Sequence, residues 1–366
     1  MGNTALETLR KMLNISSLAQ MLFEQETMLA ASPEAERLFP EARTGNTAEH
    51  IFGTTVEQYR QFKGSGSMFF TGELAGILCD VTVTALSPYA LVTASATYQV
   101  QKSSTMLSVA QRVRQPMASI MAITPKLFPL LEETSDRYAL ARASEINQSL
   151  YQILRITGNL ELYADSRLVL HRSRVDLGMW LQTLADRLEP LIQSSHKTLE
   201  YLRPVGSCLC SIDETQMERA LLNLIANAMQ FTTAGDAIFL SYKQHGNRVI
   251  IVIRDQGSGI PADQMGTIFQ RSEHRGQIPD PRWGIGLGLP VTRNVVEAHG
   301  GRLMLESEEH VGTAVYISLD TRTDSDNCIL RSPVHLPEVS NGIDPVLVAL
   351  SDVLPPSVFD TRGLDL

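Results

Sequence analysis

The chain has 366 residues, of which 43% are hydrophobic and 19% are charged, a composition typical of a globular protein with a substantial core. Its formal net charge of −9 argues against a general affinity for nucleic acid or for an anionic membrane surface. No apolar run reaches the ~18–20 residues that cross a bilayer, and the start of the chain lacks the pattern of a signal peptide. We therefore expect a cytoplasmic protein with no membrane span, whose four cysteines are free thiols.

The pattern of apolar residues divides the chain into four regions. Residues 1–98 mix short helical and strand-like segments, and residues 99–168 have helical spacing almost throughout. Residues 169–320 alternate helix and strand and hold the glycine motifs, whereas residues 321–366 are rich in Pro, Ser and Asp. We therefore expect two folded domains joined by a helical one, followed by a Pro-rich tail that either docks on a surface or stays loose.

The first region has the pattern of a small α/β domain. Residues 18–23 and 27–31 favour two strands around a turn, after which Ser32 is a good N-cap for a helix. The β-branched runs 76–85 and 89–96 predict two antiparallel strands. This order of elements, which feeds into a long helix, resembles a PAS sensor domain. The sequence shows no haem or flavin ligand pattern, and an unrelated α+β domain is the alternative.

The second region contains two apolar stripes with helical spacing. The first runs from Met106 to Leu127 and the second from Leu140 to Leu160, with a break expected around residues 129–135. A helical hairpin of this kind cannot cover both of its apolar stripes by itself. Pairing two copies into a four-helix bundle would cover them, so we expect a homodimer through residues 99–168. A hairpin that packs on a neighbouring domain of the same chain is the alternative.

Two asparagines stand four residues apart in the segment Leu221-Leu-Asn-Leu-Ile-Ala-Asn-Ala-Met-Gln-Phe-Thr232. On a helix, Asn223 and Asn227 would therefore lie on one face. Their carboxamide oxygens could face Mg²⁺ while the apolar residues of the opposite face reach a core. Two asparagines at this spacing are by themselves more often ordinary surface residues.

The segment Val252-Ile-Arg-Asp-Gln-Gly-Ser-Gly-Ile-Pro261 predicts a strand that ends in a carboxylate and a glycine-rich turn. A buried carboxylate at the end of a strand, here Asp255, can accept a hydrogen bond from an exocyclic amine such as that of adenine. Gly257 and Gly259 would allow the backbone to approach a flat ligand closely. An ordinary Asp-Gly loop is the alternative.

Three glycines at alternate positions, Gly284, Gly286 and Gly288, precede a helical pattern. A glycine-rich loop that enters a helix N-terminus offers backbone N–H groups to phosphates. The spacing differs from that of a dinucleotide-binding loop, and no strand precedes it. Gly300-Gly301 then ends the helix, and a predicted strand pair follows at Arg302–Ser307 and Gly312–Leu319.

In this order, the three segments resemble the N, G1 and G2 boxes of the catalytic domain of sensor histidine kinases, and Ile268-Phe269 resembles the F box. The resemblance covers about 150 residues, from Val175 onward. It implies the Bergerat-type ATP-binding α/β sandwich that histidine kinases share with gyrase, the heat-shock 90 chaperones and MutL. The expected fold is therefore α+β overall: a PAS-like domain, a dimeric helical hairpin and a C-terminal α/β sandwich.

The resemblance also implies a role for individual residues. Asn227 should bind Mg²⁺, Asn223 should line the phosphate side as the candidate catalytic residue, and Asp255 should read the adenine amine. Gln230 stands where the family often has a lysine, which should weaken but not abolish the attraction of phosphate. The expected ATP-binding set comprises Asn223, Asn227, Gln230, Asp255, Gly257, Gly259, Ile260, Phe269, Arg275, Gly284, Gly286, Leu287, Gly288, Leu289 and Thr313. Residues 262–283 should form a lid, and Arg275 in it could meet the γ-phosphate or be a solvated side chain.

The phosphoacceptor motif departs from the family pattern. The family carries His followed by an acid, then Arg and Pro, and the matching segment here is Gln111-Arg-Val-Arg-Gln-Pro-Met117. Gln111 replaces the histidine and Arg112 replaces the acid. The amide nitrogen of glutamine has no free lone pair, and arginine cannot act as a general base at working pH. We therefore expect self-phosphorylation at this position to fail.

Three functions remain open. The chain could be an ATP-binding histidine kinase of a two-component pathway that phosphorylates a partner in trans. It could instead be a pseudokinase-like, nucleotide-gated scaffold that binds a response regulator or a partner kinase. An ATPase or serine kinase on the same fold is the weakest possibility, because Asn223 stands where hydrolysing relatives have a glutamate base.

Overall fold

The computed structural model describes residues 2–96, 104–133, 137–164, 168–204, 206–265, 268, 286–321 and 343–360. The chain forms two compact units. Unit 1 contains Met1–Val100, Ser258–Ile268 and Arg302–Val315, and unit 2 contains Gln101–Gly257, Phe269–Gly301 and Tyr316–Leu366.

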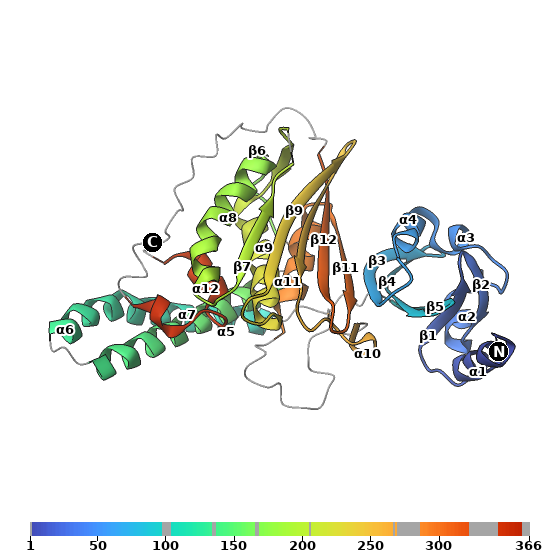
Figure 1. Cartoon of the computed structure of the whole chain (residues 1–366), viewed down its shortest axis with the longest axis horizontal. Coiled ribbons are helices and arrows are strands. Elements are labelled where there is room, and N and C mark those ends of the chain that lie inside the picture. Colours follow the sequence, from blue (N-terminus) through green and yellow to red (C-terminus); the bar gives the residue numbers. More distant parts are fainter. Residues whose placement is uncertain are drawn as a thin grey trace. The chain divides into compact units, whose positions relative to one another are not determined.

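Unit 1 is built around an antiparallel sheet with short helices, whose N-terminal part, residues 2–96, is shown in blue to cyan in Figure 1. Its elements are α1 (Gly2–Asn14), β1 (Ala19–Glu24), β2 (Thr27–Ala31), α2 (Pro33–Leu38), α3 (Ala48–Phe52), η1 (Gly53–Thr55), α4 (Val56–Arg60), β3 (Ser67–Leu74), β4 (Ile77–Leu86), β5 (Tyr89–Ala96), α10 (Ala262–Met265) and β11 (Arg302–Glu308). The strand β12 (Gly312–Asp320) begins in unit 1 and ends in unit 2.

The N-terminal strands pair in the order β2-β1-β5-β4-β3. The predicted strands at 18–23, 27–31, 76–85 and 89–96 are confirmed within one or two residues, and β4 pairs antiparallel with β5. Ser32 is the N-cap of α2, as predicted, because its hydroxyl accepts from Ala35 N at 3.2 Å.

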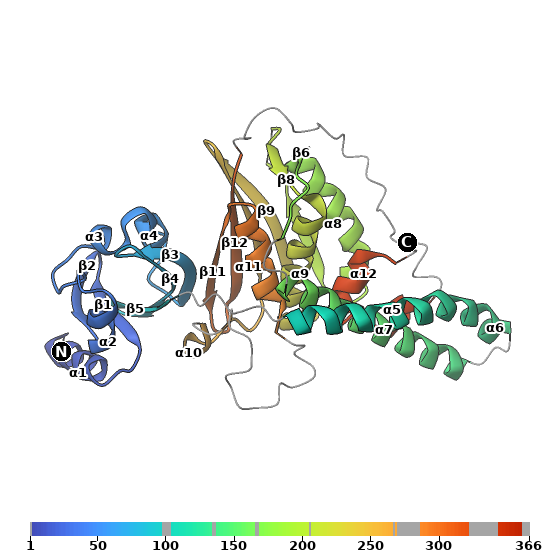
Figure 2. The same ribbon diagram turned by 180° about the vertical axis from the view of Figure 1, so that it is seen from behind.

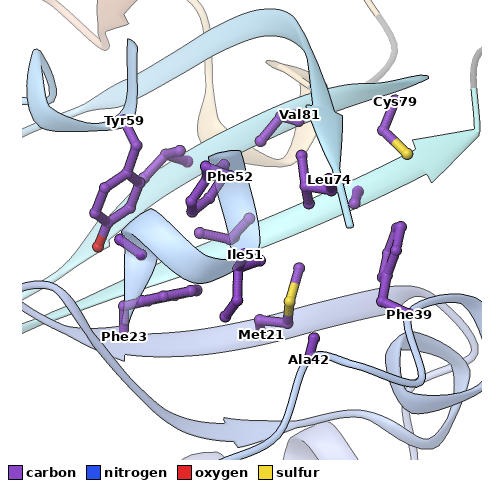
Figure 3. Packing of buried hydrophobic residues seen from close by; sticks show 14 of the residues in the cluster. Met21, Phe23, Phe39, Ala42, Ile51, Phe52, Tyr59, Leu74, Cys79 and Val81 are labelled. Atoms are coloured by element: carbon purple, nitrogen blue, oxygen red, sulfur yellow. The ribbon is translucent and has the colours of Figure 1, made fainter. Parts of the chain in front are cut away.

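One face of this sheet is closed by aromatic side chains from the helices. Phe52 stacks on Tyr59 with ring centroids 4.8 Å apart, and Phe23 lies 5.8 Å from Phe52. Figure 3 shows these rings together with Met21, Ile51 and Leu74, all of them buried. The interior of unit 1 is therefore filled by its own side chains.

A pairing that the sequence did not predict adds β11 to the edge of this sheet. β11 runs antiparallel to β3, with Met304 opposite Phe70 and Ser307 opposite Ser67. Gly66 has φ +64, and a Cβ atom at this residue would lie 2.5 Å from the carbonyl oxygen of Ser307. Only glycine fits this close approach of two backbones.

Unit 2 contains a helical hairpin and an α/β layer, which Figures 1 and 2 show from opposite sides. Its elements are α5 (Ser104–Ile123), η2 (Thr124–Lys126), α6 (Leu127–Glu133), α7 (Arg137–Ala164), β6 (Ser173–Asp176), α8 (Leu177–Gln193), β7 (Thr198–Leu202), β8 (Leu209–Ile212), α9 (Glu214–Phe231), β9 (Ala237–His245), β10 (Arg248–Asp255), α11 (Gly288–Ala298), α12 (Pro345–Leu350) and η6 (Pro356–Phe359).

The predicted hairpin is present, since α5 packs against α7 and Arg114 pairs with Glu161 at 3.0 Å. Helix α6 ends at Glu133 and α7 begins at Arg137, which agrees with the end of the predicted break at 129–135, although Pro129 itself lies inside α6. The sequence did not predict the 3-10 turn η2 at Thr124–Lys126, which carries a Pro at its first positions, where proline is tolerated. The four-helix bundle and the homodimer stay predictions.

The sheet of unit 2 is mixed. β10 pairs antiparallel with β9, and β7 pairs parallel with β9. Buried and partly exposed residues alternate along β9 and β10, which is the pattern of a sheet covered on one face. Helix α8 packs on β7, helix α9 packs on β9 and β10, and α11 packs beside α9 (Figure 2). The coarse α+β prediction is thus confirmed, and Arg302–Ser307 and Gly312–Leu319 form the predicted strands β11 and β12.

Part of the predicted tail is folded. Residues 343–360 form α12 and η6, which pack on α7, and their buried side chains are Val346, Leu347, Leu350, Leu354, Val358 and Phe359. The ring of Phe359 lies 5.2 Å from that of Tyr151 on α7. Among the helices of the described ranges, none combines the length and apolarity that a membrane crossing needs.

Candidate functional site

The two asparagines of the first motif lie on α9, a helix that local sequence specifies well. Asp213 is its N-cap and accepts from Gln216 N at 3.0 Å. The apolar residues of α9 are buried against the sheet, which fixes the rotation of the helix. Asn223 is 4% exposed and Asn227 is half-buried, and both lie on the side of α9 that faces a cavity.

This cavity spans about 420 Å³, a volume that includes space open to solvent, and its described lining residues all belong to unit 2. Three elements contribute to its wall: helix α7, helix α9 and the turn that starts α11. The lining residues are Arg155, Ile156, Asn159, Asn223, Asn227, Gln230, Gly286, Leu287 and Gly288. The structure therefore brings together the predicted residues Asn223, Asn227, Gln230, Gly286, Leu287 and Gly288.

The polar groups of the cavity wall are only partly satisfied. Asn159 Nδ2 donates to Asn223 Oδ1 at 3.3 Å, which leaves the Asn223 amide nitrogen to face another acceptor. Asn223 Nδ2 and Arg155 Nε are both buried and have no hydrogen-bond partner among the described residues. A buried donor without an acceptor is costly, so both groups are suited to an acceptor that the described residues do not supply.

Gly288 lies beside both asparagines. A Cβ atom at Gly288 would come no nearer than 3.8 Å to the side chains of Asn223 and Asn227. The backbone at the start of α11 therefore lies directly against the carboxamides. Leu289 follows on the same helix, and Leu287 packs with Val291 and with Leu162 of α7.

The predicted adenine-reading carboxylate, Asp255, is buried at the end of β10. Its Oδ1 accepts from Gly257 N at 2.9 Å, so the glycine turn folds back on the carboxylate. A Cβ atom at Gly257 would lie 2.4 Å from the carbonyl oxygen of Phe231 at the end of α9. Glycine is required here because the turn passes against the backbone of α9.

Three further predicted residues are described within unit 1. Ile260 N donates to Ser307 Oγ at 2.8 Å, and Thr313 Oγ1 lies 3.0 Å from the same hydroxyl. Gly259 has φ +66, and a Cβ atom there would lie 2.1 Å from the carbonyl oxygen of Glu308. The predicted residues Phe269, Arg275 and Gly284, and with them most of the expected lid, lie outside the described residues.

The predicted phosphoacceptor position, Gln111, lies on α5. Both Gln111 and Arg112 are exposed, while Met117 is buried and Arg114 forms its ion pair with Glu161. Burial and the nearby charge of Arg114 lower the pKa of Arg219 of α9, whose guanidinium lies next to Gly158. The sequence holds no histidine between residues 99 and 168, so neither helix of the hairpin could offer one in place of Gln111.

One histidine of unit 2 is buried and has a structural role. His299 Nε2 accepts from Asp213 N at 3.0 Å, and His299 Nδ1 lies 2.7 Å from Val295 O, to which it donates. This hydrogen bonding needs a neutral imidazole. Burial lowers the pKa of His299, which agrees with that state.

Sequence reasoning missed the contribution of α7 to the cavity. Arg155 and Asn159 stand four residues apart, so they share a face of the helix. Two polar residues at this spacing beside the apolar stripe were the available signal. Their proximity to α9 depends on how α7 packs, which periodicity alone does not give.

Comparison with known proteins places this region in a family. Residues 212–323 match the model of the histidine kinase-, DNA gyrase B- and HSP90-like ATPases. The alginate biosynthesis sensor protein KinB of Pseudomonas aeruginosa is 27% identical over 235 residues, which are 62% of this chain and 38% of that protein. The sensor protein kinase WalK of Staphylococcus saprophyticus is 31% identical over 150 residues, which are 40% of this chain and 24% of that protein.

Among solved structures, full-length ShkA in complex with AMPPNP matches with a TM-score of 0.47 and 21% sequence identity. The match covers 60% of this chain and 46% of the ShkA chain. The chain spans less than half of the length of each of these relatives. The family match therefore covers residues 212–323 and identifies this part of the chain as similar to the histidine kinase-, DNA gyrase B- and HSP90-like ATPase domain.

Proposed function

We propose that this chain binds MgATP in the cavity of unit 2 and acts in a two-component pathway without phosphorylating its own hairpin. The observation that carries the proposal is the cavity itself, which brings together predicted nucleotide-binding residues. Two buried donors in its wall, Arg155 Nε and Asn223 Nδ2, have no acceptor among the described residues. Phosphate oxygens are acceptors only, which matches those donors.

The adenine would be read by Asp255, whose buried carboxylate can accept from the exocyclic amine. Gly257 supports this role, because its N–H already orients one carboxylate oxygen. Phe269 and Leu289 are proposed to contribute to the nucleotide site on the basis of the family resemblance.

The phosphates would lie against Asn223, Gln230 and the backbone of the glycine loop, with Asn227 as the protein ligand of Mg²⁺. This donor set fits such a complex, because Mg²⁺ keeps waters and phosphate oxygens and needs one or two protein oxygens. The Mg²⁺ would neutralise phosphate charge. Asn223 is a poor general base for hydrolysis, since its oxygen accepts from Asn159 and its amide is not basic.

Phosphotransfer to this chain's own hairpin would fail for lack of a nucleophile. Gln111 and Arg112 are exposed on α5, and the sequence has no histidine between residues 99 and 168. We therefore propose that a histidine-bearing partner kinase or a response regulator is the next component of the pathway. The replacement of the His-acid pair by Gln111 and Arg112 also favours the second candidate function, a non-catalytic scaffold that binds a partner protein.

The domain plan that accompanies this function is a PAS-like sensor domain at 1–98, a dimerising hairpin at 99–168, an ATP-binding domain at 169–320 and a tail at 321–366. The strand order β2-β1-β5-β4-β3, with helices between β2 and β3, supports the PAS-like assignment. The apolar residues exposed on the hairpin, such as Ile120, Ile146 and Ile153, support a homodimer.

Two measurements test the proposal. Calorimetric titration of the full chain with MgATP should show binding. Incubation with γ-labelled ATP should leave this chain unlabelled, alone or mixed with a partner kinase that keeps its histidine but has an inactivated nucleotide site.

Label on the partner would establish action in trans, and binding with no labelled protein would establish the scaffold. Both outcomes support ATP binding without self-phosphorylation. Label on this chain, or phosphate release without any labelled protein, would contradict it, as would the absence of any MgATP binding.

A further inference from the structure

Arg155 gives the cavity its charge. Among the described residues that line it, Arg155 is the only one with a charged side chain, and the others are amides, apolar residues and glycines. Arg155 comes from α7 of the hairpin and not from the ATPase domain. A cationic side chain in the wall of a polar cavity favours an anionic ligand.

The folded C-terminal segment holds this arginine in place. Arg155 Nη1 donates to Ala349 O at 3.3 Å, and Arg155 Nη2 pairs with Asp352. The segment is anchored independently, since Arg187 pairs with Asp344 at 3.2 Å and Leu347 and Leu350 are buried. The position of the guanidinium is therefore fixed before any ligand binds, which lowers the entropic cost of using it.

These contacts leave part of the guanidinium unused. The group has five N–H donors in a planar fork, and the C-terminal segment takes one acceptor on each terminal nitrogen. Arg155 Nε is buried with no partner among the described residues, and so is Asn223 Nδ2 in the same cavity wall. Both are N–H donors, so one ligand with several acceptor oxygens would satisfy both.

We propose that Arg155 binds the phosphates of the nucleotide from the hairpin side and takes over the role of the cation that Gln230 no longer supplies. This inference rests on the proposed ATP binding. Gln230 lines the same cavity, and an amide there offers hydrogen bonds but no charge. Arginine is suited to the task because its fork matches phosphate oxygens and it stays charged at working pH.

The test compares two ligands on the full chain by calorimetry: Mg-AMPPNP, which has the phosphates, and adenosine, which lacks them. Arg155→Gln should weaken Mg-AMPPNP binding tenfold or more, the size expected for a lost hydrogen bond to a charged group, and should leave adenosine binding unchanged. Arg155→Lys should give an intermediate loss, because a lysine keeps the charge without the fork.

Two controls separate a direct contact from a structural role. Asp352→Asn breaks the ion pair to the C-terminal segment but keeps Arg155, so it should weaken Mg-AMPPNP binding less than Arg155→Gln does and should leave adenosine binding unchanged. Arg187→Gln removes an arginine that also pairs with the C-terminal segment, through Asp344. Unlike Arg155, Arg187 is not among the residues that line the cavity. It should also preserve the preference for Mg-AMPPNP over adenosine.

Wild-type affinity for Mg-AMPPNP in Arg155→Gln would overturn the inference while leaving ATP binding in place. Equal losses for both ligands, reproduced by Asp352→Asn, would also overturn it and show that Arg155 is structural. Failure of the wild-type chain to bind either ligand would instead defeat the proposed function. Thermal melting of each variant should confirm that it is folded.

Discussion

The cavity between α7 and α9 and the predicted phosphoacceptor position on α5 lie in the same unit, yet they differ in how tightly the fold constrains them. The cavity side chains are buried or half-buried and held by neighbours, as Asn223 is by Asn159. Gln111 and Arg112 on α5 are exposed. A buried polar residue is constrained by the cost of leaving its partners unsatisfied, whereas an exposed one is constrained only by its chemistry. A chain can therefore lose the side chain that accepts the phosphoryl group while it keeps the side chains that bind the nucleotide.

The largest expected effect comes from restoring the missing nucleophile and its acid. The double variant Gln111→His, Arg112→Glu should become labelled by γ-labelled ATP, where the wild-type chain takes up none, because imidazole supplies a free lone pair and the carboxylate a base. The matched single variant Arg112→Glu should stay unlabelled. If the double variant bound ATP yet took up no label, the loss of self-phosphorylation would involve more than these two positions. The contrast between the buried cavity and the exposed position on α5 would then not explain it.

The next largest effect concerns the carboxylate of the nucleotide site. Asp255→Asn should weaken MgATP binding by roughly 10–150-fold, the equivalent of about 1.5–3 kcal/mol for a hydrogen bond to a charged group. Calorimetric titration checks the change. Asp236→Asn is the control, because Asp236 accepts from Thr233 N at 2.7 Å in a neighbouring loop and has no proposed ligand contact. Equal affinity in Asp255→Asn and wild type would remove the basis for adenine recognition.

Two glycines of the site should behave differently on substitution by alanine. Gly257→Ala places a Cβ 2.4 Å from the Phe231 carbonyl oxygen and should lower the free energy of unfolding by about 1–3 kcal/mol. Gly288→Ala meets nothing nearer than 3.8 Å and should leave stability unchanged or raise it by up to ~1 kcal/mol, as alanine favours helix. Urea unfolding of both variants measures the difference, and equal stabilities would show that the turn can relax.

The smallest effect concerns His299, a buried histidine with a structural role. Burial lowers the pKa of His299 below its ordinary 6.5, so the unfolded chain binds a proton more readily than the folded one. The stabilising contribution is therefore complete above about pH 6.5 and is lost as the pH falls through the folded-state pKa. The melting temperature should fall between pH 7.5 and 5.5 by more in wild type than in His299→Gln. His310→Gln, at an exposed position, should melt like wild type at both pH values.

Sequence alone predicted the elements that local signals determine. The cap Ser32 and the helical spacing of Asn223 and Asn227 depend on residues within one or two turns. For this reason, the strands of unit 1, the hairpin and the α9 side of the cavity agree with expectation.

The remaining features depend on contacts between distant parts of the chain. Asn159 meets Asn223 across 64 positions, and Asn147 meets Phe359 across 212. No local pattern states which turn of α7 will face α9, or that β11 will pair with β3. These outcomes are decided by tertiary packing, so Arg155 could be assigned to the cavity only from the structure.

The way α7 holds the C-terminal segment has a consequence for mutational tolerance. Gln148 Nε2 donates to Ser351 O at 2.8 Å and to Leu354 O at 2.9 Å, and Asn147 Nδ2 donates to Phe359 O at 2.8 Å. All three acceptors are peptide carbonyls, which every amino acid carries. Substitutions along the segment can therefore accumulate without loss of these hydrogen bonds. Replacing the single residue Gln148 would remove the donor to Leu354 O and leave Ser351 O with the longer hydrogen bond from Gln152 Nε2 at 3.4 Å.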